Sequence, residues 1–187
     1  MAANLTSGGA RPRNRWSLPM WGAAACLLLT PWVAMRFDTG VNWTALDFAV
    51  FGSMLVLACG AYELGARVTS NFCYRAATAI TVVAGFLMVW INLAVGIIGD
   101  EGNPANLMFA GVLLIGIVGA LAARLRPRGM AHALAAMAVA QAAIAAVSLL
   151  EGWRESVVLS GFFAALWLAS AWLFRKAASN AAPGRAR

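Results

Sequence analysis

Six apolar stretches, each long enough to cross a lipid bilayer, constrain the fold of this chain more than any other feature. At about 1.5 Å per residue, some 20 helical residues cross about 30 Å of hydrocarbon, and only a helix or a closed barrel satisfies its own backbone there. With 62% hydrophobic and 11% charged residues, a chain of 187 residues has too little polar surface for a soluble domain. We therefore predict an all-α membrane protein with six transmembrane helices, at roughly 16–35, 45–66, 76–99, 107–123, 131–150 and 156–174.

The charged residues alternate between the segments that join these stretches. Of the 14 Lys and Arg residues, all except Arg36 and Arg154 lie before the first stretch, after the last, or in the second and fourth loops. By the positive-inside rule, both termini are predicted to be cytoplasmic in a bacterial inner membrane. Because the bases form short clusters between apolar runs, the net charge of +7 does not indicate a nucleic-acid partner. The opposite side carries Asp38, Asp100, Glu101, Glu151 and Glu155.

The domain organisation follows from these stretches. Residues 16–174 are predicted to form a single six-helix transmembrane domain. The basic segments 1–15 and 175–187 are predicted to be disordered. The start of the chain has some features of a signal peptide, but the main apolar run follows Cys26, so we expect the first helix to be retained.

The six stretches also group into three similar hairpins. Gly52, Gly111 and Gly161 each follow an apolar pair near the start of the second, fourth and sixth stretches, and each of these stretches ends at a cytoplasmic base. This period predicts an internal repeat of helical hairpins, which could surround a pseudo-threefold axis. The alternative is that no repeat exists, because small residues and basic ends are common to membrane helices in general. The hairpins would cover 16–66, 76–123 and 131–174.

One of these hairpins resembles a known family. The segment "LLLTPWVAMRFDTGVNWTALDFAVFG" is similar to the membrane hairpin of the SPW-repeat family of small bacterial membrane proteins. Thr30, Pro31 and Trp32 occupy the place of the Ser-Pro-Trp motif, and the match covers about residues 24–60. The whole chain also resembles inner-membrane proteins of proteobacteria, through "VWINLAVGIIG", "NPANLM" and "RPRGMA". Both resemblances imply the membrane architecture and bring no activity.

The third loop is the most polar segment in the middle of the chain. Asn103 and Pro104 fit an N-cap and the first helical position, which indicates a well-capped turn. The alternative is a cation site at a channel mouth, because hard cations bind carboxylate and amide oxygens. We favour the turn because the cap accounts for most of the same residues. The candidate ligands are Asp100, Glu101, Asn103 and Asn106.

Few polar side chains fall within the apolar stretches. Asn92 and Gln141 are expected to hydrogen-bond between helices, or alternatively to line a polar path. Glu63 and Arg67 are four residues apart and are predicted to form a structural ion pair near the cytoplasmic surface. None of these positions places a charge at the centre of the bilayer, which weakens the case for a proton pump.

The partners expected from the sequence are lipids and other membrane helices. Arg124, Arg126 and Arg128 fill one cytoplasmic loop and could bind anionic lipid. Faces of small residues, such as Gly119 and Ala123, could pack within one chain, between copies, or against a membrane partner.

The residues that catalysis or metal binding requires are scarce. The chain has one His and three separate Cys, and it carries no Walker loop, HExxH or GxSxG motif. We therefore predict neither a cofactor nor a metal and no enzymatic activity. The expected function is a structural or accessory membrane component that packs with itself or with a partner. The alternative is a small channel or transporter with a polar path through the bundle.

Overall fold

The computed structural model describes residues 17–37 and 40–181, and these residues form helices without a strand. A short 3₁₀ turn, η1 (Pro104–Asn106), leads into the fourth helix. Six helical segments are long and apolar enough to cross a membrane, the fourth of them counted together with η1. The predicted all-α fold, with six helices that are long and apolar enough to span a membrane, is thereby confirmed. The helices are α1 (Ser17–Ala34), α2 (Ala45–Val68), α3 (Phe72–Ala94), α4 (Leu107–Ala122), α5 (Pro127–Leu150) and α6 (Arg154–Asn180).

The third helix lies earlier in the chain than the sequence indicates. It begins at Phe72, where the Asn71 side chain accepts a hydrogen bond from the backbone amide of Tyr74 (3.3 Å), and it ends at Ala94. The apolar run continues past this end, but Gly96 takes a positive φ of 73° and turns the chain out of the helix. Ile97 and Ile98 then fold back into the core at 3% and 1% exposure. Hydropathy alone could not separate this buried loop from a helix, because both are apolar.

The last helix is longer than expected. The segment 175–187 was predicted to be a disordered tail, but α6 continues through Arg175 to Asn180. Phe174, Ala177 and Ala178 are buried against the other helices, so packing extends the helix beyond the apolar run. Residues 1–16 and 182–187, which include the rest of both predicted tails and Arg11, Arg13, Arg15, Arg185 and Arg187, lie outside the described residues, as does Asp38.

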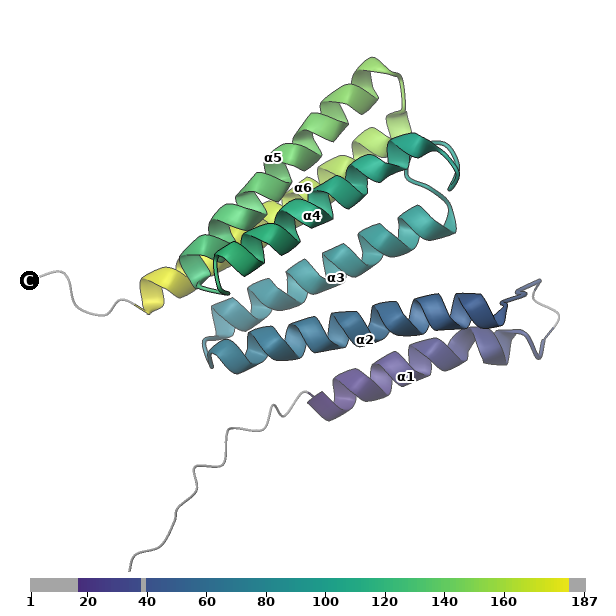
Figure 1. Ribbon diagram of the computed structural model, residues 1–187, viewed down its shortest axis with the longest axis horizontal. Helices are drawn as coiled ribbons and strands as arrows, with labels where there is room; N and C mark the ends of the chain where they lie inside the picture. The colour runs from purple at the N-terminus through teal and green to yellow at the C-terminus, as the bar shows by residue number, and fades with distance from the viewer. Residues whose placement is uncertain (1–16, 38–39, 182–187) are drawn as a thin grey trace, which may run out of the picture.

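α6 occupies the centre of the bundle. It packs against α5 and α3, whereas α4 packs mainly on α5, α2 on α3, and α1 on α2 (Figure 1). The second predicted hairpin is therefore not a closely packed pair, since α3 and α4 each have a different main neighbour. The buried residues of α6 recur every three or four positions along one face, which is the spacing of closely packed helices. They include Ser156, Ser160, Phe163, Trp167, Ser170 and Phe174.

Glycines allow the helices to approach each other inside the chain. A Cβ atom built on Gly119 would lie 2.5 Å from Cβ of Ala133, so α4 and α5 are nearly in backbone contact there. A Cβ on Gly65 would lie 2.5 Å from Cγ2 of Thr78, which brings α2 equally close to α3. These two small-residue surfaces therefore join helices of one chain, one of the alternatives that the sequence left open.

The turns are placed at two ends of the bundle. The start of α1, the α2–α3 and α4–α5 turns and the end of α6 lie at one end (Figure 1). We call this the basic end, because seven of its described side chains are Arg or Lys: Arg67, Arg75, Arg124, Arg126, Arg128, Arg175 and Lys176. The opposite end, which we call the acidic end, carries Asp100, Glu101, Glu151 and Glu155 beside Arg36 and Arg154.

Candidate functional site

Asn106 organises the loop at the acidic end. Its Oδ1 accepts hydrogen bonds from the backbone amides of Ile97 (3.1 Å) and Ile98 (2.9 Å). Its Nδ2 donates to the carbonyls of Ile98 (3.2 Å) and Asp100 (2.7 Å). The side chain is 5% exposed and uses both its oxygen and its amide nitrogen on backbone groups. Asn106 is thus a structural anchor of the loop rather than a free ligand.

The other candidate cation ligands also bond to the backbone. Asn103 Oδ1 accepts from the amide of Ala105 (3.0 Å) and caps η1, with Pro104 at its first position. Asp100 Oδ1 accepts from the amide of Gly102 (3.1 Å), and Glu101 is exposed. Within the described part of the chain, no three His, Cys, Asp or Glu side chains gather as metal ligands would. This geometry matches the capped turn that the sequence favoured.

Asn92 joins α3 to the same loop. Its Nδ2 donates to the carbonyl of Asn106 (3.2 Å), while its Oδ1 is buried and has no hydrogen-bond partner within residues 17–37 and 40–181. Asn92 is therefore part of the polar cluster around Asn106 and lies near the end of α3, not at its centre.

A second polar cluster lies buried between α5 and α6. Gln141 Nε2 donates to Ser160 Oγ (3.2 Å), and Ser148 Oγ lies 2.9 Å from Ser156 Oγ. All four side chains are fully buried, so the two helices are linked by hydrogen bonds in the interior of the bundle. We call these residues the polar seam. Gln141 was a candidate from the sequence, but the serines were missed because single serines in apolar runs are common. Their spacing on one face of α6, with Ser156 and Ser160 four residues apart, was the available signal.

Three buried polar atoms of α5 and α6 have no hydrogen-bond partner among the described residues. They are Gln141 Oε1, Trp167 Nε1 and Ser170 Oγ, in side chains that are 0% exposed. Buried polar groups normally find a partner, and unpaired ones are typical of sites that hold water or a polar ligand. Gln141 and Asn92 belong to separate clusters, because one contacts α6 and the other the α3–α4 loop.

At the basic end, Glu63 joins α1 to α2. The predicted ion pair is present, with Arg67 Nη2 3.2 Å from Glu63 Oε2. Glu63 Oε1 also accepts hydrogen bonds from Ser17 Oγ and from Trp21 Nε1, the latter at 3.0 Å. The sequence did not indicate these two contacts, since their partners are far from Glu63 in the chain. The carboxylate therefore holds the first helix in place.

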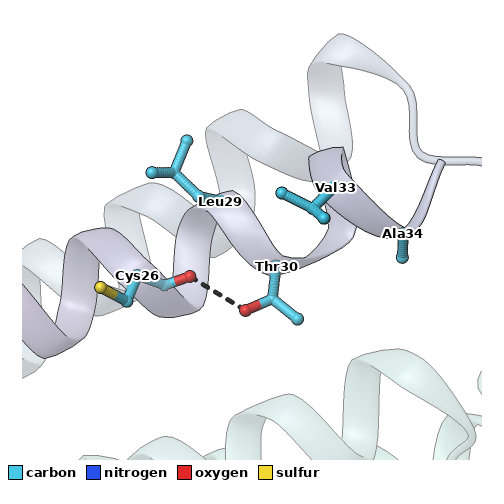
Figure 2. A pocket seen from close by; sticks show the side chains of 5 residues that line it. All are labelled: Cys26, Leu29, Thr30, Val33 and Ala34. Atoms are coloured by element: carbon cyan, nitrogen blue, oxygen red, sulfur yellow. Dashed lines mark hydrogen bonds between the residues drawn. The ribbon is translucent and has the colours of Figure 1, made fainter. Parts of the chain in front are cut away.

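The surface of the described residues includes two open hollows. One is lined by five side chains of α1, which Figure 2 shows as Cys26, Leu29, Thr30, Val33 and Ala34. The Thr30 hydroxyl donates to the carbonyl of Cys26 (2.9 Å), so this face presents little unpaired polarity (Figure 2). The second hollow lies at the basic end. Its lining includes Arg124, Arg126 and Arg128 together with the adjoining ends of α4, α5 and α6.

Comparison of the chain with protein-family models, with curated proteins and with solved structures gives no match.

Proposed function

We propose that this chain is a multi-pass protein of the bacterial inner membrane with both termini in the cytoplasm. Seven of the nine described bases gather at the end where α1 begins and α6 ends, and this asymmetry supports the orientation. Within that membrane we propose a non-enzymatic structural or accessory role, in which the protein packs with a second copy or a partner subunit.

The observation that carries this proposal is that the amide side chains of Gln141 and Asn92 form hydrogen bonds with neighbouring segments of the bundle. Gln141 donates to Ser160 on the neighbouring helix, and Asn92 donates to the carbonyl of Asn106. Side chains that fasten helices together are typical of a rigid scaffold, and each such bond stabilises a membrane bundle by about 0.6–2 kcal/mol.

The uncovered face of α1 is the surface where we propose the association. α1 has only α2 as a main neighbour, and Cys26 is exposed on it. A Cβ on Gly22 would meet nothing within 4 Å, so a second helix could approach closely at this position. Gly22, Cys26 and Thr30 follow one another at intervals of four residues and share one side of the helix. Small side chains on one side let helix backbones come together in lipid.

The native cysteines provide a direct test. In native membranes, a short bis-maleimide should join two chains through Cys26, or join one chain to a partner in a larger product. Cys59 is buried and offers the matched control, because a chain that keeps only Cys59 should give no product. A chain that keeps only Cys26, and is modified there as a monomer without any cross-link, would contradict this packing.

We also infer that the three hairpins descend from one ancestral unit. The recurring glycines and basic ends of the sequence support this, and Gly111 and Gly161 share an open environment. Gly52 has diverged, since a Cβ there would lie 3.6 Å from Leu28 on α1.

A small channel is the second candidate, favoured by the unpaired polar atoms Asn92 Oδ1 and Gln141 Oε1. In this case water or an ion would complete their hydrogen bonds along a path through the bundle. Flux through liposomes containing the protein should then fall in an Asn92→Leu, Gln141→Leu double variant. Thr81→Val is the control, because the Thr81 hydroxyl bonds within its own helix to Ala77. Equal flux in all three proteins would eliminate the path.

A further inference from the structure

The arginine hollow at the basic end is built on a constrained turn. Arg124 and Leu125 both have a positive φ, at 47° and 57°. Residues other than glycine rarely adopt this backbone conformation. The turn is held by Tyr74 of α3, whose hydroxyl donates to the carbonyl of Leu125 (2.8 Å) while its ring is 1% exposed. The backbone that carries the arginines is thus fixed from the core of the bundle.

The three guanidinium groups have no carboxylate partner in the described part of the chain. Arg124, Arg126 and Arg128 are exposed and border one hollow, which α6 closes on one side through Ala178. Among residues 17–37 and 40–181 the one ion pair is Arg67 with Glu63, so no acidic side chain neutralises the hollow. Like charges held around a common space repel one another, and an anion placed there would relieve that repulsion.

The surface beside the hollow is suited to acyl chains. Ala122 lines the hollow, and Val118 lies one turn earlier on the same face of α4. Val118 and its neighbour Leu121 are 56% and 73% exposed, so this side of α4 is left uncovered. An anion with an apolar tail could therefore place its charge among the arginines and its tail along α4.

We propose that this hollow binds the phosphodiester headgroup of an anionic phospholipid. Guanidinium groups match phosphate oxygens in geometry and charge, and the hollow lies at the end of the spanning helices, where headgroups are found. The site does not depend on the packing role proposed above, because the association face is on α1 and the hollow is on α4, α5 and α6.

Lipid retention by the full-length protein tests this site. The protein is purified in a neutral detergent, titrated with phosphatidylglycerol or phosphatidylcholine, and its bound lipid is counted by native mass spectrometry. Wild type should retain phosphatidylglycerol at least about tenfold more tightly, since only this lipid carries a net charge. Each arginine removed should weaken binding about fivefold, so R126Q/R128Q should lose about 25-fold.

A matched control variant distinguishes lipid binding in the hollow from a general effect of positive charge at the basic end. R67Q/K176Q removes two bases from the same end, but neither residue lines the hollow. This control should change retention less than about threefold, because its charges act only through the screened surface potential. If R126Q/R128Q aggregates, the single variants R124Q, R128Q and K176Q are compared instead. R124Q and R128Q should each weaken phosphatidylglycerol retention about fivefold, and K176Q should not.

Three results would overturn the site: equal losses in the two double variants, equal retention of the two lipids, or displacement of bound lipid by excess glycerol phosphate. The last would assign the hollow to a soluble phosphate. Retention that survives glycerol phosphate and depends on the three arginines supports the lipid.

Discussion

Asn106 makes more hydrogen bonds than any other candidate site residue, and its removal should be costly. In Asn106→Ala, the buried amides of Ile97 and Ile98 would lose their acceptor. We expect the free energy of unfolding to fall by about 3 kcal/mol, measured by denaturant titration in mixed micelles. Asn103→Ala removes one capping bond and should lower it by only about 1 kcal/mol. Equal effects of the two substitutions would show that Asn106 does not organise the loop.

Glu63 gives a prediction about a single carboxylate that positions a helix. Glu63→Leu removes the acceptor of Ser17 and Trp21, so α1 should detach more often from α2. Hydrogen exchange of backbone amides in α1 should become about tenfold faster, while exchange in α6 stays unchanged. Arg67→Leu removes only the ion pair, in which Arg67 is 74% exposed, and should leave α1 unaffected. Faster exchange in both variants would assign the effect to the ion pair instead.

These residues also indicate what the sequence could reveal about the site. The Asn103 cap and the Glu63–Arg67 pair were predictable, because each joins residues within one helical turn. Ser17 lies 46 positions from Glu63, and nothing local links them. The role of Asn106 was predictable only in part. Its polar side chain indicated a loop, but its hydrogen bonds with the amides of Ile97 and Ile98 depend on how the chain folds back.

At the scale of elements, the α4–α5 contact should be sensitive to one methyl group. Gly119→Ala would place a Cβ 2.5 Å from Ala133, whose rigid backbone cannot move aside. We expect α4 and α5 to separate slightly and the free energy of unfolding to fall by about 1–3 kcal/mol. Gly116→Ala meets the flexible end of Met137 and should have a smaller effect.

A glycine on the same helix provides the control for this prediction. Gly111 has no atom within 4 Å of a built Cβ, so Gly111→Ala should be neutral or stabilise the helix by up to about 1 kcal/mol. Opposite signs for positions 111 and 119 would confirm that the close approach, and not helix propensity, sets the effect. Equal stabilisation at both would contradict the packing of α4 on α5.

The existence of the helices was predictable from the sequence, but their neighbours were not. Long apolar runs indicate membrane-spanning helices, because a helix pairs its own backbone polar groups and its apolar side chains are stable in lipid. Lipid-facing and helix-facing side chains are equally apolar, however, so composition does not tell which face is buried. Phe162 and Phe163 are adjacent in α6, yet one is 52% exposed and the other 0%. For the same reason the sequence grouped α3 with α4, whereas α3 packs chiefly on α6 and α2.

At the scale of the whole molecule, the separation of charge between the two ends predicts one orientation. Ser70 lies in the α2–α3 turn at the basic end, and Glu101 lies at the acidic end; both are exposed. We replace the three native cysteines by alanine and introduce either Ser70→Cys or Glu101→Cys. In intact cells, a membrane-impermeant maleimide should label the variant with Cys at 101 and not the variant with Cys at 70.

Permeabilising the inner membrane should then expose the thiol at position 70, which controls for its reactivity. The reverse labelling would contradict the orientation and leave the six helices intact, because length and hydropathy alone define those. The outcome also bears on the arginine hollow. The cytoplasmic leaflet is rich in anionic lipid, so a basic end that faces the cytoplasm places Arg124, Arg126 and Arg128 where such headgroups are available.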